Sequence, residues 1–205
     1  MNDWITIVDY GMGNIGSLRN MFKRIGHGTE IASMPEDVRR ARKILLPGVG
    51  AFDPAMERLE TSGLGEAVRA KALGDGAPTL GICLGMQLLG DGSEEGDRPG
   101  LSLIPAHARR FPREVGKVPH MGWNEVAPTG PSELTATLPP ESRFYFVHSY
   151  YVLATDPRDA ILRCEYGLPF HAAIQRGNVY GAQFHPEKSH RYGMAFLKAF
   201  AELPC

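Results

Sequence analysis

Hydrophobic and polar positions alternate in blocks along the first half of the chain. Short apolar segments typical of buried strands are separated by segments whose apolar residues recur with helical spacing. The predicted strands are 5–10, 28–32, 43–47 and 78–85, and the predicted helices are near 15–25, 53–61 and 64–73. Strands that alternate with helices in this way predict parallel β-α-β units and a sheet that is covered on both faces.

The pattern changes in the second half, where apolar segments follow one another too closely for crossover helices to fit between them. These predicted strands are 143–153, 160–166, 170–175 and 178–185. We therefore expect them to be at least partly antiparallel. A last helix is predicted at 190–202, and the Gly-, Asp- and Glu-rich segment 91–99 is predicted to be an exposed loop.

Length and composition favour one globular domain spanning residues 1–205. The chain has 22 Lys and Arg against 23 Asp and Glu, so nucleic acid is not an expected partner. We interpret its two basic clusters, one formed by Arg39, Arg40, Arg42 and Lys43 and the other by Arg109 and Arg110, as solvated surface. No apolar run reaches the roughly 18 residues that a membrane span needs. The start, with Asp3 and Asp9, does not resemble a secretory signal, so a cytoplasmic location is expected.

One short motif carries the strongest chemical signal. Gly81-Ile82-Cys83-Leu84-Gly85 follows a predicted buried strand and precedes a helical pattern, which is the plan of a nucleophile elbow. Glycines at both ends of such a motif let the chain turn sharply around the central residue. Cys83 would then lie at the start of a helix, where the helix dipole favours its thiolate form. A small apolar residue in a glycine-rich turn is the alternative that this motif alone leaves open.

A base for Cys83 is available much later in the chain. His185, Pro186 and Glu187 follow the end of a predicted strand. His185 could accept the Cys83 proton, while Glu187 would fix the imidazole tautomer and stabilise its charged form. A lone histidine at the end of a strand is more often structural, and it is the elbow cysteine in the same chain that favours a catalytic pair.

Acyl chemistry also needs donors for an oxyanion. The segment Pro47-Gly48-Val49-Gly50 follows a predicted strand, and its glycines would let the amides of Gly48 and Val49 point into a site. The Leu84 amide would complete the oxyanion hole. On its own, this segment would be read as an ordinary turn.

A competing motif predicts a different function. Gly11-Met12-Gly13-Asn14-Ile15-Gly16 is a G-x-G-x-x-G sequence between a predicted strand and helix, with Glu30 near the end of the second strand. Taken alone, it predicts a protein that binds NAD. That hypothesis leaves the elbow, the Pro47–Gly50 segment and the His-Pro-Glu sequence without a role.

Together these sequences resemble the class I, triad-type glutamine amidotransferases. The resemblance is carried by PGVGAF (47–52), GICLGMQ (81–87), KVPHMGWN (117–124), FYFVHSYY (144–151) and QFHPEKS (183–189). VDYGMGN (8–14), KVPHMGWN and HPEKS make it closest to the glutaminase subunits of imidazole glycerol phosphate synthase. It implies a three-layer, flavodoxin-like α/β fold with a mostly parallel sheet and antiparallel strands in the C-terminal half.

The resemblance also implies roles for individual residues. Cys83 would be the nucleophile, His185 the general acid and base, and Glu187 its orienting partner. The residues expected to hold glutamine are Gly50, Gln87, His148, Ser149 and Tyr150. Those expected to face a partner are Asn14, Met121, Trp123, Tyr145 and Lys188.

The expected reaction is hydrolysis of glutamine to glutamate, with ammonia passed to a (β/α)8-barrel cyclase subunit in histidine biosynthesis. No cofactor is expected, and the spacing of the histidines and cysteines predicts no metal site. Two alternatives of the same fold stay open, a paralogue that supplies an amidine-forming enzyme of surface-sugar synthesis and a catalytically silent binding protein.

Overall fold

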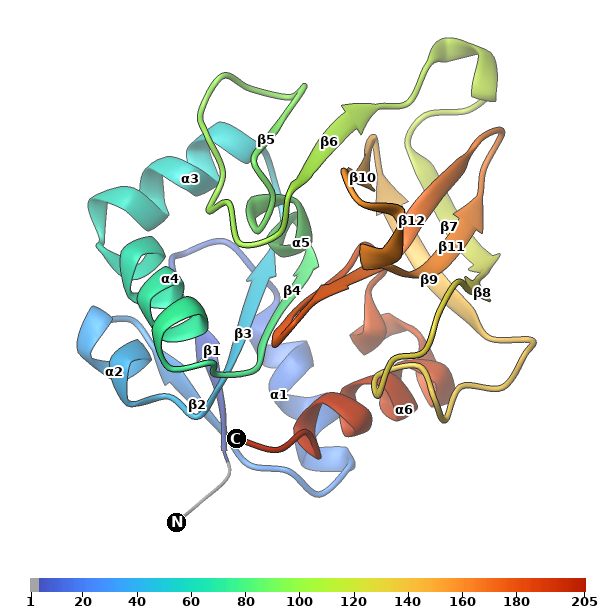
Figure 1. Cartoon of the computed structure of the whole chain (residues 1–205). Helices are drawn as coiled ribbons and strands as arrows, with labels where there is room; N and C mark the ends of the chain where they lie inside the picture. The colour runs from blue at the N-terminus through green and yellow to red at the C-terminus, as the bar shows by residue number, and fades with distance from the viewer. Residues whose placement is uncertain (1–3) are drawn as a thin grey trace.

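The computed structural model describes residues 4–205 and contains an eight-stranded sheet with the order β2-β1-β3-β4-β13-β12-β11-β8 (Figure 1). Its strands are β1 (Ile5–Val8), β2 (Thr29–Ala32), β3 (Lys43–Gly48), β4 (Thr79–Cys83), β8 (Ala127–Pro128), β11 (Ala160–Glu165), β12 (Pro169–Arg176) and β13 (Val179–Ala182). Neighbours from β2 to β13 are parallel, whereas those from β13 to β8 are antiparallel. Asp3, one of the two residues that argue against a secretory signal, lies outside the described residues.

Helices cover both faces of this sheet. On one face lie α1 (Ile15–Arg24) and α6 (His190–Ala201), and on the other lie α2 (Pro35–Arg40), α3 (Phe52–Thr61), α4 (Leu64–Gly74) and α5 (Leu84–Leu88) (Figure 1). Alternate residues of β3 enter opposite cores, since Leu45 packs in the cluster of α1 and α6 while Ile44 and Leu46 pack in the other. The result is the predicted three-layer α/β architecture.

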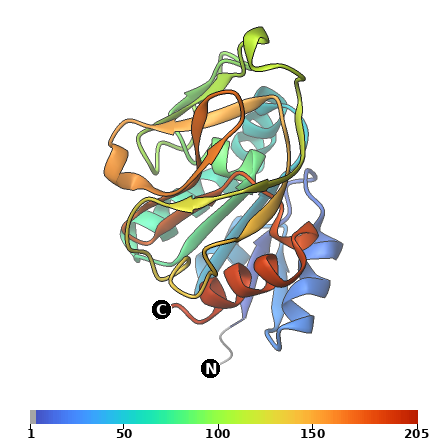
Figure 2. The same cartoon turned by 90° about the vertical axis from the view of Figure 1, so that its right-hand side faces the viewer.

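Two small sheets complete the molecule. One has the order β10-β6-β5, and the other is a two-stranded antiparallel ribbon of β7 and β9 (Figure 2). Their strands are β5 (Gly92–Ser93), β6 (Ala106–Arg110), β7 (His120–Glu125), β9 (Arg143–His148) and β10 (Tyr150–Ala154). The short 3-10 helices are η1 (Arg113–Val115), η2 (Pro157–Asp159) and η3 (Pro186–Lys188). Because β9 leads directly into β10, the two small sheets meet at Ser149.

The β-α-β pattern of the first half and the antiparallel strands of the second half confirm the sequence prediction, with several differences in detail. The predicted strand 143–153 is divided at Ser149 between two sheets, and the predicted strand 78–85 ends at Cys83, where α5 begins. The segment 91–99 is not simply an exposed loop, because Gly92 and Ser93 form β5 and are buried. The sequence did not predict α2, β6, β7 or β8.

The interpretation of Lys43 as solvated surface is wrong. Its side chain lies at the start of β3, where the residue is only 2% exposed, and Nζ donates a hydrogen bond to the Ala201 carbonyl oxygen at 2.6 Å. Lys43 therefore ties the parallel sheet to the end of α6, while Arg39, Arg40, Arg109 and Arg110 are exposed as expected.

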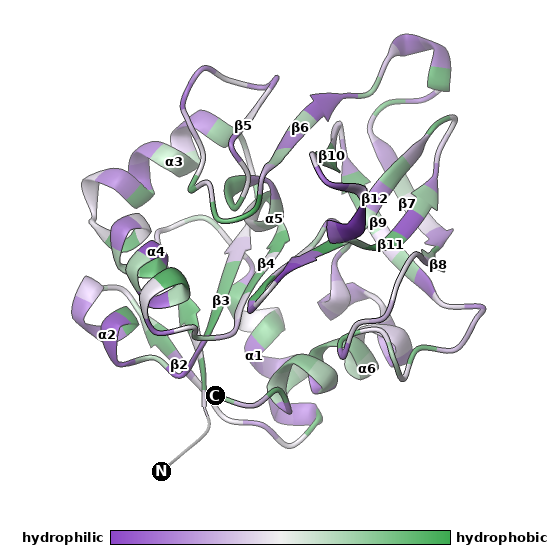
Figure 3. Ribbon diagram, viewed as in Figure 1, coloured by the Kyte–Doolittle hydropathy of each residue, from purple (hydrophilic) through white to green (hydrophobic). Residues whose placement is uncertain are grey.

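The ribbon coloured by hydropathy shows where the core lies (Figure 3). The central strands β3 and β4 are fully buried, and α6 turns an apolar side that includes Phe196, Leu197 and Phe200 toward the sheet. Among residues 4–205, no helix has both the length and the apolar character needed to cross a membrane.

Candidate active site

The backbone at Cys83 has the geometry of a nucleophile elbow. Cys83 ends β4 and caps α5, with φ 55° and ψ −112°. A positive φ is costly for a residue with a side chain, and such strain is typically found at functional sites. It turns the thiol out of the sheet, into the space beyond the carboxyl end of β4.

The two glycines of the motif are required by close backbone packing. A methyl group on Gly85 would overlap the Leu46 carbonyl oxygen, and one on Gly81 would lie 2.6 Å from the Gly85 carbonyl oxygen. The elbow therefore packs directly on itself and on β3, which explains the predicted glycine-x-Cys-x-glycine spacing.

His185 is held facing Cys83 by contacts with β9. Its amide donates to the Tyr145 carbonyl oxygen at 2.9 Å, and its own carbonyl accepts from the Ser189 hydroxyl at 2.6 Å. Its Nδ1 lies 2.8 Å from Glu187 Oε1, and a carboxylate can only accept, so Nδ1 carries a proton. This leaves Nε2 for the hydrogen bond between the imidazole and Cys83.

The charge of His185 follows from these contacts. Burial lowers its pKa, but the hydrogen bonds to Cys83 and Glu187 outweigh burial and raise the pKa to about 10. The side chains of His185 and Glu187 are only 4% and 3% exposed, and Glu187 Oε2 has no hydrogen-bond partner among the described residues. A buried carboxylate in this position stabilises an imidazolium beside Cys83.

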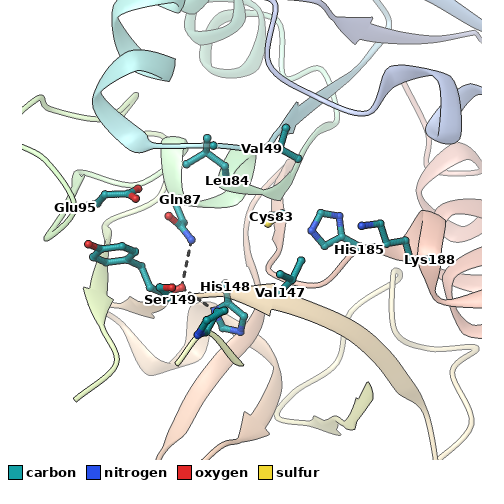
Figure 4. Close-up of a pocket in the computed structure, with 13 residues that line it drawn as sticks. Val49, Cys83, Leu84, Gln87, Glu95, Val147, His148, Ser149, His185 and Lys188 are labelled. Carbon is teal, nitrogen blue, oxygen red and sulfur yellow. Dashed lines mark hydrogen bonds between the residues drawn. The ribbon is translucent and has the colours of Figure 1, made fainter. Parts of the chain in front are cut away.

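A cavity of about 380 Å³ opens next to Cys83 and His185 (Figure 4). Its remaining lining residues are Val49, Gly50, Leu84, Gln87, Glu95, Pro119, Val147, His148, Ser149, Tyr150 and Lys188. The structure thus brings together all the residues that were predicted to hold glutamine. Of the predicted oxyanion-hole residues, Val49 and Leu84 line the cavity, whereas Gly48 lies behind it, against Gly85 and the Tyr10 hydroxyl.

Two buried amides connect the cavity wall to the thiol. Gln87 Nε2 donates to the Tyr150 carbonyl oxygen at 3.3 Å and to Gln183 Oε1 at 3.2 Å. Gln183 Nε2 in turn lies 3.9 Å from Cys83 Sγ. Sequence reasoning missed Gln183, although an amide at the end of an otherwise apolar strand, two residues before His185, was an available signal.

Sequence reasoning also missed Glu95, because the segment around it was interpreted as a solvated loop. The backbone amide of Phe52, at the start of α3, donates to Glu95 Oε2 at 2.9 Å. This contact holds the Glu95 segment against the cavity, where Glu95 is the carboxylate among the lining residues and Lys188 is the ammonium.

Four of the five predicted partner-facing residues gather on one surface. Met121 and Trp123 are 61% and 45% exposed on the outer face of β7, Trp123 packs edge-on against Tyr145 of β9, and Lys188 lies over the Tyr145 ring. Asn14 is also exposed, but its side chain caps α1 by accepting from the Ser17 amide at 3.3 Å.

The glycine-rich segment 11–16 is packed against the protein itself. A Cβ on Gly13 would lie 3.0 Å from the Pro47 side chain, and one on Gly50 would lie 2.7 Å from the Met12 side chain. The first turn after β1 therefore lies on the Pro47–Gly50 segment next to the cavity. The NAD-binding hypothesis did not predict this contact.

The three cysteines, all in the described part of the chain, are free, and only Cys83 lines the cavity. Within residues 4–205, no group of three or more His, Cys, Asp or Glu residues could hold a metal ion.

The family model of class-I glutamine amidotransferases matches residues 6–202. The chain belongs to the class-I glutamine amidotransferase family. Members of this family are glutamine-hydrolysing enzymes, so the NAD-binding hypothesis is not favoured. The match begins within β1 and runs to the end of α6, so it includes residues from every strand of the large sheet.

This class-I glutamine amidotransferase has close relatives among curated proteins. It is 48% identical over 200 residues to "Imidazole glycerol phosphate synthase subunit HisH 2" of Pseudomonas aeruginosa, with 97% of this chain and 99% of that protein covered. It is 45% identical over 203 residues to "Imidazole glycerol phosphate synthase subunit HisH" of Bdellovibrio bacteriovorus, with 97% and 100% covered.

Solved structures of the family share the fold. PurLQS from Thermotoga maritima matches with a TM-score of 0.74 at 17% identity, covering 98% of each chain. A crystal structure of a glutamine amidotransferase matches with the same TM-score at 18% identity, covering 96% of this chain and 98% of that one. These likenesses confirm the predicted class-I architecture.

Proposed function

We propose that this amidotransferase is the glutaminase subunit of an imidazole glycerol phosphate synthase, with Cys83 as nucleophile, His185 as general acid and base, and Glu187 as its orienting carboxylate. The observation that carries the proposal is the strained Cys83 elbow facing a buried imidazole whose other nitrogen is held by Glu187. The subunit assignment is supported by the names of relatives at 45% to 48% identity over nearly the full chain. Residues 1–205 would act as one domain, since both halves share one sheet.

The geometry supports a two-step hydrolysis. The Cys83 thiolate attacks the carboxamide carbon of glutamine, and the imidazolium of His185 gives its proton to the departing nitrogen, so that ammonia leaves and a γ-glutamyl thioester remains. Neutral His185 then takes a proton from water, which attacks the thioester and releases glutamate and the thiolate. Backbone amides of the Gly48–Val49 segment and of Leu84 would hold the oxyanion in both steps.

The cavity fits the other end of glutamine by charge. An amino-acid substrate carries an α-ammonium, and Glu95 offers a carboxylate at the cavity wall. Gly50, Gln87 and the segment His148–Tyr150 would contact the rest of the substrate through backbone and amide groups. A volume of about 380 Å³ is enough for one amino acid with its first water molecules.

The partner would be a cyclase subunit of the (β/α)8-barrel type. The outer face of β7 and β9 supports this role, because the exposed Met121 and Trp123 form an aromatic and apolar patch beside Tyr145 and Lys188. Val147, which lies opposite Met121 in the ribbon, lines the cavity. Ammonia released in the cavity would travel only a short distance to the docked partner. Because the reaction would belong to amino-acid biosynthesis, we place it in the cytoplasm.

The experiment compares glutamate release by the native chain, Cys83→Ala and Cys205→Ala, each with the cyclase partner and its ligand present. We expect Cys83→Ala to lose at least about 10³-fold in kcat, because acyl transfer has no other nucleophile at the elbow. Cys205 is exposed and outside the cavity, so Cys205→Ala is the matched control and should keep native turnover. Turnover that survives in Cys83→Ala would reject the proposed nucleophile.

A further inference from the structure

Two buried histidines outside the triad form a pair that the hydrolysis does not use. His120 and His148 are 3% and 6% exposed and lie directly opposite each other in the ribbon of β7 and β9. His120 Nδ1 and His148 Nε2 are 2.9 Å apart. The rings pack among Phe111, Phe146 and Phe170, which leaves little of their surface exposed.

The neighbours of the pair fix the position of every proton in it. His148 Nδ1 lies 2.8 Å from the Tyr150 carbonyl oxygen, which can only accept, so Nδ1 carries the proton. In a neutral ring Nε2 then accepts, and the donor is His120 Nδ1. This leaves His120 Nε2 to accept from Asn124 Nδ2 at 3.4 Å. The resulting series of hydrogen bonds runs in one direction, from Asn124 through both imidazoles to the Tyr150 carbonyl.

Both rings stay neutral at physiological pH. Burial, together with the charges of His120 and His185, lowers the pKa of His148 to about 3, although its hydrogen bond to Tyr150 opposes this. Burial lowers the pKa of His120 to about 4.

The last acceptor in this series of hydrogen bonds, the Tyr150 carbonyl, also contacts an amide in the cavity. The Tyr150 carbonyl that His148 holds is also the acceptor for Gln87 Nε2, whose second proton goes to Gln183 Oε1. With both Nε2 protons used, Gln87 presents its Oε1 as the atom that can accept from a substrate. The dashed lines of Figure 4 show the two hydrogen bonds that converge on this carbonyl.

We propose that His120 and His148 are positioning residues for glutamine binding, which hold the Tyr150 carbonyl so that Gln87 turns its acceptor oxygen toward the N–H donors of the substrate. The inference rests on the proposed glutaminase function. Neither histidine touches the reacting atoms. Removing the donor to the carbonyl would free Gln87 to rotate its amide, and the cavity would lose an acceptor for the substrate rather than a catalytic group.

The test uses two substitutions at one position. In His148→Asn, the side-chain amide nitrogen takes the place of Nδ1 and can still donate to the Tyr150 carbonyl. In His148→Gln, the amide lies one bond further out, near the place of Nε2, and that donor is lost. A matched pair at position 120 follows the same logic, because His120→Asn keeps a donor toward His148 and His120→Leu does not.

Steady-state glutamate release is measured for each variant with the cyclase partner present. We expect the KM for glutamine to rise about tenfold in His148→Gln, as for loss of about 1.4 kcal/mol of binding, with a smaller change in kcat. The KM of His148→Asn should rise less than that of His148→Gln, and that of His120→Leu should exceed that of His120→Asn. KM does not depend on the fraction of folded enzyme, so partial unfolding cannot imitate this pattern.

The outcomes separate the two proposals. Equal KM values for His148→Asn and His148→Gln, or a fall in kcat at unchanged KM, would overturn the positioning role while the triad stands. If the native chain released no more glutamate than Cys83→Ala, the proposed function itself would fail, and the positioning role would fall with it.

Discussion

The parallel half of the large sheet, from β2 to β13, and the antiparallel region, with its two-stranded ribbon, contribute to the site in different ways. Strands β1, β3 and β4 are buried along their whole length, and their carboxyl ends supply the Pro47–Gly50 segment and Cys83. In the ribbon, β7 and β9 alternate between inward and outward residues. The comparison teaches that Cys83 belongs to a core closed on both faces, whereas the cavity residues Val147 and His148 belong to an element with one open face.

The largest expected effect on stability comes from a substitution in the parallel half. Gly85→Ala would drive a methyl group into the Leu46 carbonyl oxygen, so the elbow and β3 would have to separate. We expect a loss of roughly 4 kcal/mol or more of unfolding free energy, together with loss of glutaminase activity. Urea unfolding measures the first and glutamate release the second.

Gly74→Ala is the matched control for this substitution. Gly74 lies at the exposed end of α4, and a methyl group added there would meet no atom within 4 Å, so alanine should be neutral or slightly stabilising. Similar losses of unfolding free energy from both substitutions would mean that the close approach of the elbow and β3 does not account for the effect of Gly85→Ala.

Substitutions in the ribbon should have a smaller effect on the free energy of unfolding, and the effect should differ between the inner and outer faces of the ribbon. Phe146 points inward, is fully buried and stacks on His120, so Phe146→Ala should cost about 3–5 kcal/mol of unfolding free energy. Trp123 points outward at 45% exposure and stacks on His190, so Trp123→Ala should cost roughly 1 kcal/mol.

Trp123→Ala costs less stability than Phe146→Ala, but its effect on partner-dependent activity should be the larger of the two. Trp123→Ala is expected to weaken the stimulation of glutaminase activity by the cyclase, measured by titrating the partner into a fixed amount of subunit. A Trp123→Ala chain that responds to the cyclase like the native one would remove the outer face of the ribbon from the proposed interface.

The last expected effect depends on pH and concerns His185, which links the two regions. Burial lowers the pKa of His185, but Cys83 and Glu187 raise it more, from the ordinary 6.5 to about 10. A raised pKa in the folded state stabilises the fold fully below pH 6.5, and this contribution is lost as pH rises through about 10. We expect native unfolding free energy to fall by roughly 2 kcal/mol more between pH 6.5 and pH 10 than that of His185→Gln. Parallel pH curves for the two proteins would contradict the charged pair.

The sequence was sufficient to predict most elements of the parallel half, although not α2, and to propose the residues of the triad. Strands β1, β3 and β4 are continuous apolar runs, so their pattern was unambiguous. The elbow was predictable because glycines flank a cysteine where a strand ends. His185 and Glu187 were predictable only in combination with that cysteine, since about 100 residues separate them from it.

The ribbon, the histidine pair and the position of Glu95 could not be predicted from the local sequence pattern. The apolar run 143–153 crosses from one sheet into another at Ser149, and nothing in its alternation marks that break. The His120–His148 pair depends on a register between strands 28 residues apart, and Glu95 on a contact with the start of α3. Such long-range contacts follow from how the elements pack, which the sequence of each element does not specify.

The position of β13 has a consequence for how the protein is made. β4, which ends at Cys83, has β3 on one side and β13 on the other, and β13 spans Val179–Ala182. A ribosome synthesises the chain from its N-terminus, so the cysteine strand keeps one open edge for about a hundred residues of translation. His185 follows almost immediately after the strand that closes this edge. An unfinished chain therefore carries Cys83 without His185, and the two side chains come together only when synthesis is almost complete.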